Sequence, residues 1–126
     1  MRRANAFGFK HGPARDADLL FDVRFLPNPH YEPELRPLTG FDSRVVAHVG
    51  RDGRLEEFYA HLLPLLEFLL PQYVAEGKAH LSVAIGCTGG RHRSVAIVEA
   101  VAARLRGDER FSVAVVHRDV ERPAAR

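Results

Sequence analysis

The 126-residue sequence predicts a single α/β domain in which helices flank a mixed, partly parallel sheet. Three observations predict this class. Residues 80–85 and 111–116 are short, apolar and rich in β-branched side chains, and residues 94–105 repeat apolar side chains at helical spacing. A strand, a helix and a strand in this order make a βαβ unit, whose two strands are parallel. The length suits one domain, and no internal repeat or linker-like change of composition divides the chain.

The first quarter of the chain predicts two further strands. We expect a short strand at residues 5–9 and a longer one at residues 19–26, because apolar and charged side chains alternate there. The charged members of the longer strand are Asp22 and Arg24, and two charges on one strand face indicate a polar site beside it. Residues 27–33 contain three prolines, which forbid regular structure and predict a stiff loop that can hold side chains in place.

The middle of the chain predicts one long helix. Apolar residues recur at every third or fourth position from residue 55 to about residue 74, as in a helix with one buried face. Pro64 is expected to bend or divide this helix, because proline lacks the backbone N–H that a helix interior requires. The second expected helix, at residues 94–105, is closed by Arg106 and Gly107.

Composition and charge exclude several classes of protein. Hydrophobic residues make up 46% of the chain and charged residues 27%, so the chain can bury a core and is not a disordered tail. The apolar stretches are too short or interrupted for a membrane span, and no signal peptide is visible. The single cysteine, Cys87, cannot form an internal disulfide, which fits a reducing cytoplasm. A net charge of +2 does not by itself demand a nucleic acid partner.

The segment from Gly86 to Ser94 carries the clearest functional signal. It connects a predicted strand to a predicted helix, and ligands bind at this turn in open α/β sheets. Its glycines let successive backbone N–H groups point inward, and the helix N-terminus adds the positive end of a dipole. The sequence therefore predicts a phosphate-binding strand-loop-helix; the competing interpretation is an ordinary glycine turn with exposed arginines. The residues expected to form the cradle and its charged surroundings are Gly89, Gly90, Arg91, His92 and Arg93.

The same segment also fits the C-x-x-G-x-x-R-S/T loop of cysteine-dependent phosphatases. In that chemistry the Cys87 thiolate would attack phosphorus, Arg93 would grip two oxygens and Ser94 would stabilise the thiolate. Asp22 is the candidate general acid. However, Gly86 stands where such phosphatases usually carry histidine, and a loop of this pattern can bind phosphate without cleaving it. We expect binding without turnover, with a phosphatase as the alternative.

The histidines do not predict a metal site. His11 follows the first predicted strand, His30 lies in the proline-rich loop and His92 in the glycine-rich loop. No pair of histidine or cysteine residues has metal-ligand spacing such as C-x-x-C or H-E-x-x-H. We therefore expect neither a metal nor another cofactor.

Five motifs agree in order and spacing with one known family. They are residues 7–12 (FGFKHG), 16–18 (DAD), 21–30 (FDVRFLPNPH), 35–40 (LRPLTG) and 83–95 (VAIGCTGGRHRSV). Together they closely resemble the carboxy-terminal domain of the RapZ/YvcJ family. The resemblance runs from about residue 6 to residue 121, so residues 1–126 are expected to form a single domain of this kind.

The resemblance implies a bacterial cytoplasmic regulatory domain. Family members join an amino-terminal P-loop nucleotide-binding domain to this domain, which in the best-known members binds small regulatory RNAs and glucosamine-6-phosphate and dimerises within a tetramer. The residues that would hold the phosphate are Thr88, Gly89, Gly90, Arg91, His92 and Arg93. Those that would line the rest of the pocket are Lys10, His11, Asp22, Arg24, His30 and Arg51.

Two departures limit what the resemblance implies. The sequence contains no G-x-x-x-x-G-K-S/T motif, so ATP or GTP binding is not carried over, and a separate chain would have to supply the P-loop domain. Residues 118–126 contain two acids and no lysine, which makes RNA a less secure partner than a sugar phosphate. We therefore expect a homodimeric sensor of an amino-sugar phosphate, with RNA as a second partner. An RNA-binding module without a metabolite is the remaining alternative.

Overall fold

Four strands, three α-helices and two short 3-10 helices make up the described part of the chain, which comprises residues 2–12, 14, 17–78, 81–107 and 112–121 of the computed structural model. The elements in chain order are β1 (Arg2–Gly8), η1 (Phe9–His11), β2 (Leu19–Asp22), η2 (Pro29–Tyr31), α1 (Ser43–Val49), α2 (Arg54–Ala75), β3 (Leu81–Cys87), α3 (Arg93–Arg106) and β4 (Val113–His117).

The strands form one sheet in the order β2-β3-β1-β4, and every described pair is parallel. The predicted α/β class is confirmed, but the sheet is parallel where a mixed one was expected. The register places Gly8 beside Cys87 and Asp22 beside Gly86, so the carboxyl ends of β1, β2 and β3 meet at one edge. Loops that leave this edge are therefore brought together.

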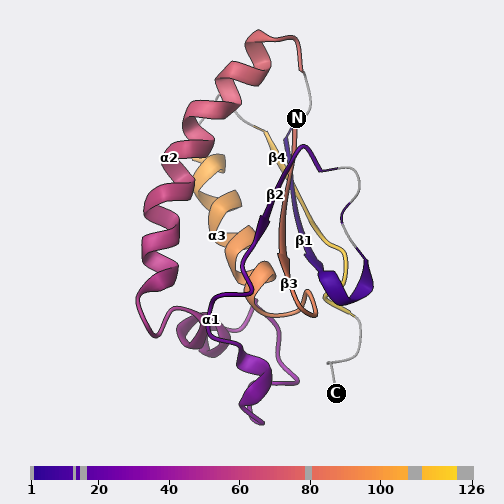
Figure 1. Cartoon of the computed structure of the whole chain (residues 1–126), viewed down its shortest axis with the longest axis vertical. Helices are drawn as coiled ribbons and strands as arrows, with labels where there is room; N and C mark the ends of the chain where they lie inside the picture. Colours follow the sequence, from indigo (N-terminus) through magenta and orange to yellow (C-terminus); the bar gives the residue numbers. More distant parts are fainter. Residues whose placement is uncertain (1, 13, 15–16, 79–80, 108–111, 122–126) are drawn as a thin grey trace.

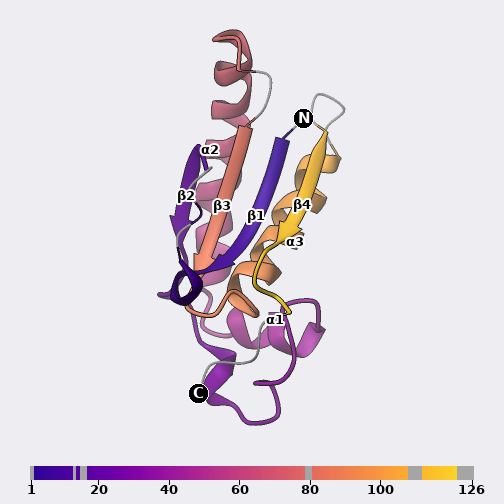
Figure 2. The ribbon, with the colours of Figure 1, turned by 90° about the vertical axis from the view of Figure 1, so that its right-hand side faces the viewer.

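The core lies between one face of the sheet and the helices α2 and α3. Figure 1 shows these two helices side by side along the sheet, and Figure 2 shows them behind the four strands. Ile85 of β3, Leu66 and Leu70 of α2 and Ile97 of α3 are at most 1% exposed within this layer. Helix α1 and η2 lie beyond the carboxyl ends of the strands, at the bottom of Figure 1. No helix in the described part of the chain is long and apolar enough to cross a membrane.

Strand β2 is shorter than predicted, because it ends at Asp22 instead of residue 26. Asp22 Oδ1 accepts a hydrogen bond from Arg24 N at 3.0 Å, and this local bond closes a turn of the chain. Beyond this point the carbonyls of Arg24 and Leu26 accept hydrogen bonds from Arg93 Nη1, at 2.8 and 3.1 Å. The alternation in the sequence therefore does not mark a strand beyond Asp22, since Phe25 is 44% exposed where a continued pattern would bury it.

Helix α2 runs without a break from Arg54 to Ala75, so Pro64 does not divide it. Its apolar positions Leu62, Leu66 and Leu70 are buried against the sheet, and this packing outweighs the hydrogen bond lost at the proline. The predicted strands at residues 80–85 and 111–116 and the helix at 94–105 correspond to β3, β4 and α3. Residues 80 and 111 lie outside the described residues.

The sequence did not predict helix α1. Asp42 caps it, since Asp42 Oδ1 accepts a hydrogen bond from Arg44 N at 2.9 Å. Val45 and Val49, four positions apart, are both 0% exposed, and Gly50 ends the helix. The capping residue and this short apolar repeat were signals of a helix, although seven residues give the repeat only two turns.

Candidate functional site

The predicted anion loop lies at the carboxyl edge of the sheet. Residues 88–92 connect β3 to α3, and no side chain caps the N-terminus of α3. The backbone N–H groups of an uncapped first turn, together with the helix dipole, attract anions. Gly90 has a φ of +77°, in the left-handed region, and a Cβ on it would lie 2.5 Å from Gly8 N. The loop can therefore keep its shape only with glycine at position 90.

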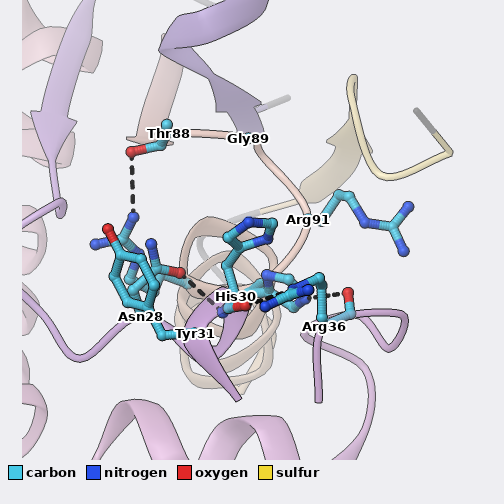
Figure 3. Close-up of a pocket in the computed structure, with 9 residues that line it drawn as sticks. Asn28, His30, Tyr31, Arg36, Thr88, Gly89 and Arg91 are labelled. Carbon is cyan, nitrogen blue, oxygen red and sulfur yellow. Dashed lines mark hydrogen bonds between the residues drawn. The ribbon is translucent and has the colours of Figure 1, made fainter. Parts of the chain in front are cut away.

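A pocket of about 460 Å³ opens in front of this loop (Figure 3). Two segments far apart in the sequence line it, namely the loop around η2 and the loop that precedes α3. The lining contains three arginines, two histidines and no carboxylate, and the arginines make it positive and rich in hydrogen-bond donors. Its residues are Asn28, His30, Tyr31, Arg36, Thr88, Gly89, Arg91, His92 and Arg93.

Arg93 is the most deeply buried cation of the pocket, with 3% of its surface exposed. Its Nη1 donates to the carbonyls of Arg24 and Leu26, and its Nη2 donates to Thr88 Oγ1 at 3.3 Å. Burial lowers the pKa of Arg93, while the nearby Cys87, a tyrosine and an aspartate act in the opposite direction. Because arginine keeps its proton in proteins, these bonds fix a positive charge at the mouth of the loop.

Arg91 ties the loop to two other parts of the chain. Its Nη1 donates to Val120 O at 2.9 Å and its Nη2 to Pro37 O at 3.0 Å. In Figure 3 its side chain extends away from His30 and Thr88. Arg91 therefore anchors the loop as well as lining the pocket.

His92 occupies the N-cap position of α3 and is 6% exposed. Its Nε2 lies 3.2 Å from Arg36 O. Burial lowers the pKa of His92, so the ring is neutral at pH 7, and the carbonyl partner requires that Nε2 carry the hydrogen. A neutral, oriented imidazole at this position can act as a directional hydrogen-bond partner.

The proline-rich loop holds His30 by its backbone. Asn28 Oδ1 accepts a hydrogen bond from His30 N at 3.1 Å, and Arg36 Nε donates to His30 O at 2.7 Å. Burial lowers the pKa of His30, and the positive charges of Arg36 and Lys10 lower it further. The loop thus presents His30 to the pocket in a fixed position, but residues 29–31 form the short 3-10 helix η2, where the prolines were expected to forbid regular structure.

Three other predicted residues lie beside the pocket and do not line it. Asp22 and Arg24 form an ion pair of 2.6 Å, and the hydrogen bond from Arg24 lowers the pKa of Asp22. The Arg24 guanidinium also stacks 4.1 Å from the centre of the Phe9 ring. Lys10 N donates to Thr88 O at 3.0 Å, which holds the start of the loop.

Two predicted residues make no described contact with the pocket lining. His11 ends η1, and Arg51 is exposed after α1, where its N–H donates to His48 O at 3.2 Å. Gly90 belongs to the loop but packs against the Gly8 backbone behind the pocket. Within the described residues, no three histidine, cysteine or acidic side chains come together as a metal ion would require.

The phosphatase candidates Cys87 and Ser94 lie behind the loop. Cys87 is 2% exposed and Ser94 is 0% exposed, and Cys87 Sγ is 3.2 Å from Ser94 Oγ. Neither residue lines the pocket. Asp22, the candidate general acid, is held by Arg24. In this conformation the thiol is therefore shielded from a ligand in the pocket.

Three lining residues were not predicted from the sequence, namely Asn28, Tyr31 and Arg36. Asn28 carried a signal, because asparagine before proline is a common helix start and Asn28 caps η2. Arg36 lay within one of the five family motifs but had no local signal of its own. Tyr31 is 76% exposed, and the sequence around it carried no signal of a role in the pocket.

Comparison with known proteins identifies the family. The model of the RapZ C-terminal domain family matches residues 3–121. The chain belongs to this family. The resemblance predicted from the five motifs is thereby confirmed.

Curated relatives of this RapZ C-terminal domain carry the name nucleotide-binding protein. The relative from Symbiobacterium thermophilum is 57% identical over 96% of the chain and 40% of its own length. Those from Rhodospirillum centenum and Geobacillus kaustophilus are 55% and 52% identical, each over 93% of the chain, and over 35% and 39% of their own lengths. The chain therefore spans about two fifths of the length of the curated relatives that it matches.

Proposed function

We propose that this RapZ C-terminal domain is a regulatory module that senses a phosphorylated metabolite. Its ligand would be an amino-sugar phosphate of the glucosamine-6-phosphate kind, bound in the pocket of Figure 3. The observation that carries the proposal is the pocket lining, which holds three arginines and two histidines and no carboxylate.

A phosphate group suits the inner end of the pocket. There the uncapped N-terminus of α3 and the buried guanidinium of Arg93 provide positive potential before any ligand arrives. Because Arg93 is already fixed by its bonds to Thr88 and to two carbonyls, little side-chain entropy is lost when an anion binds. Thr88 and Gly89 line the same pocket.

A small sugar suits the outer end. The volume of about 460 Å³ lies within the range of small-molecule sites, and Asn28 and His30 offer polar groups for hydroxyls. The choice of an amino sugar rests on the family resemblance. A regulatory role rests on the same resemblance.

Calorimetric titration tests the ligand class. We expect glucosamine-6-phosphate to bind more tightly than inorganic phosphate, and glucosamine without its phosphate to give no heat of binding. Arg36→Ala should weaken binding by about 10- to 100-fold, the range expected for one charge-assisted hydrogen bond. Arg44→Ala is the matched control, since Arg44 is an exposed arginine on α1 paired with Asp42 at 2.9 Å. The absence of heat with all phosphorylated ligands would refute the proposal.

A cysteine-dependent phosphatase is the competing function. A phosphatase would hydrolyse p-nitrophenyl phosphate at pH 5–7, and Cys87→Ser would abolish this turnover. Since the Cys87 thiol is buried and contacts Ser94, we expect no turnover above background. Turnover that disappears in Cys87→Ser would establish the phosphatase instead.

RNA, a second copy of the domain and a P-loop nucleotide-binding domain are further partners that we propose from the resemblance, in a cytoplasmic setting. RNA held through phosphate contacts should bind with an affinity that falls steeply with salt. Filter binding at several salt concentrations measures this slope. An undetectable or salt-insensitive signal would remove RNA from the set of partners.

A further inference from the structure

Asp119 is the one carboxylate among the buried side chains of the described residues, and it is 0% exposed. It is the second residue after β4 and lies outside the pocket lining. The other buried polar side chains, His92, Arg93 and Ser94, all belong to the start of α3. A buried carboxylate is costly unless it is paired and hydrogen-bonded, so its partners indicate its role.

The described partners of Asp119 include a neighbouring arginine and the backbone at the end of β1. Asp119 Oδ2 accepts hydrogen bonds from Gly8 N at 2.8 Å and from Arg118 Nε and Nη2 at 3.0 and 2.7 Å. Arg118 Nη2 also donates to Gly8 O at 3.2 Å and to Gly12 O at 2.6 Å. Arg118 and Asp119, here called the carboxy-terminal latch, therefore hold both backbone groups of Gly8.

Gly8 is in direct contact with the anion loop. A Cβ on Gly8 would lie 2.5 Å from Gly89 O and 2.7 Å from Gly90 N, so the two backbones touch. From the other side, a Cβ on Gly90 would lie 2.9 Å from Asp119 Cβ. The peptides of Gly89 and Gly90 thus rest on Gly8 and Asp119, and a shift of the latch would shift the floor of the pocket.

A second bond joins the loop to the same segment. Arg91, which lines the pocket, donates from Nη1 to the carbonyl of Val120, the residue after Asp119. Lys10 N holds the start of the loop through Thr88 O, and Lys10 lies two residues beyond Gly8. The loop is therefore tied at its start, its middle and its end to the segments that the latch joins.

We propose that Asp119 is a positioning residue for anion binding, because its carboxylate and Arg118 hold Gly8 against the Gly89–Gly90 backbone and so set the shape of the phosphate loop. This inference rests on the proposed function for its consequence on binding. Its consequence on the loop itself does not require a ligand. The two parts can therefore be measured separately.

The experiment compares Asp119→Asn and Asp119→Ala with Leu70→Ala. Asparagine keeps the size and an acceptor for Gly8 N but loses the charge that pairs with Arg118, whereas alanine removes both. Leu70 is buried in α2 against the sheet and makes no described contact with the latch, so Leu70→Ala controls for a general loss of stability. Thermal unfolding first establishes that each variant is folded at the assay temperature.

Amide hydrogen exchange and phosphate titration are then measured on the folded variants. We expect Asp119→Ala to accelerate exchange at residues 88–92 at least tenfold and to weaken binding of inorganic phosphate at least tenfold. Asp119→Asn should show smaller changes in the same direction. Leu70→Ala should leave the loop amides and the phosphate affinity within about twofold of the unmodified protein.

Two results would overturn the inference. One is loop exchange in Asp119→Ala that rises no more than in Leu70→Ala. The other is phosphate affinity that is unchanged in Asp119→Ala although the unmodified protein binds phosphate. If the unmodified protein binds neither inorganic phosphate nor glucosamine-6-phosphate nor any other phosphorylated ligand, the proposed function fails, and hydrogen exchange alone decides whether Asp119 positions the loop. Should Asp119→Ala not fold, Asp119→Asn decides by the same criteria.

Discussion

The Arg93 side chain both lines the pocket and holds the turn that follows β2. Its position six residues after Cys87 suggested an arginine that grips phosphate, and the side chain does line the pocket. Its guanidinium also bonds two carbonyls of the turn after β2 and the hydroxyl of Thr88. The local motif could not reveal the carbonyls of Arg24 and Leu26, because they lie more than 65 residues away in the sequence.

These contacts predict that Arg93→Lys destabilises the protein although it keeps the charge. Lysine cannot reproduce the planar donor fork, so buried carbonyls lose partners, and we expect the free energy of unfolding to fall by about 2–4 kcal/mol. Urea denaturation measures this change. Arg104→Lys on the same helix is the control, since Arg104 is exposed and lies 3.6 Å from Glu67. Equal effects of the two substitutions would mean that the carbonyl contacts contribute little.

A comparison of Gly90 with Gly53 tests whether the backbone around position 90 leaves room for a side chain. Gly90 and Gly53 both have positive φ, +77° and +85°, but only Gly90 is crowded by the Gly8 backbone. Gly53→Ala should therefore lower the free energy of unfolding by about 1 kcal/mol, the conformational cost alone. Gly90→Ala should cost clearly more and should also weaken phosphate binding. Matching losses in both variants would show that the loop accommodates a methyl group.

At the scale of elements, the accuracy of the sequence predictions followed the strength of the local pattern. The segments that became α2, β3 and α3 were expected, because each buries a face whose spacing is visible in the sequence. The limit of β2 was not expected, because the chain turns at the Asp22–Arg24 hydrogen bond and the bonds from Arg93 that hold the segment beyond it depend on tertiary structure. Likewise, the prolines predicted a stiff loop, but only the fold shows that Asn28 and Arg36 hold His30 in it.

Helix α2 offers a test of how strongly packing overrides local preference. Pro64 is exposed in the interior of the helix, where proline costs up to about 3 kcal/mol relative to alanine. We expect Pro64→Ala to raise the free energy of unfolding by about 1–3 kcal/mol, measured by urea denaturation. Pro33→Ala, in an exposed loop, is the control and should not stabilise. A loss of stability in Pro64→Ala would mean that the proline ring makes a needed contact.

At the scale of the whole molecule, the parallel sheet explains why the site is assembled where it is. The carboxyl ends of β1, β2 and β3 meet at one edge, so Gly8, Asp22 and Cys87 become neighbours of one loop. The α/β class and the glycine-rich loop could be predicted from the sequence. The strand order could not, because the central position of β1 depends on contacts across almost the whole chain.

The histidines predict how stability depends on pH. Burial is the main cause that lowers the pKa of His30, His48, His92 and His117 below 6.5. The unfolded chain therefore takes up protons near pH 6.5, and the folded chain only at lower pH. Stability should be greatest above pH 6.5 and decline as the pH falls below it, with a slope of up to about 1.4 kcal/mol per pH unit for each histidine.

Urea denaturation at pH 8, 7, 6 and 5 measures this decline. His117→Gln should reduce the slope, because His117 is mostly enclosed, with a side-chain exposure of 11%, between Phe41 and Glu99. A free energy of unfolding that stays constant from pH 7 to pH 5 would contradict the assignment of neutral, buried histidines.

The hydrogen bond from Gly8 to Asp119 joins groups that are 111 residues apart. A ribosome adds about 5–20 residues per second, so Gly8 is made roughly 5–20 s before its acceptor exists. During that interval β1 also lacks β4, and the Gly89–Gly90 peptides, once they are made, can contact Gly8 but not Asp119. Nascent chains should therefore complete the phosphate loop last, and the ability to bind an anion would report that translation has reached the end of this domain.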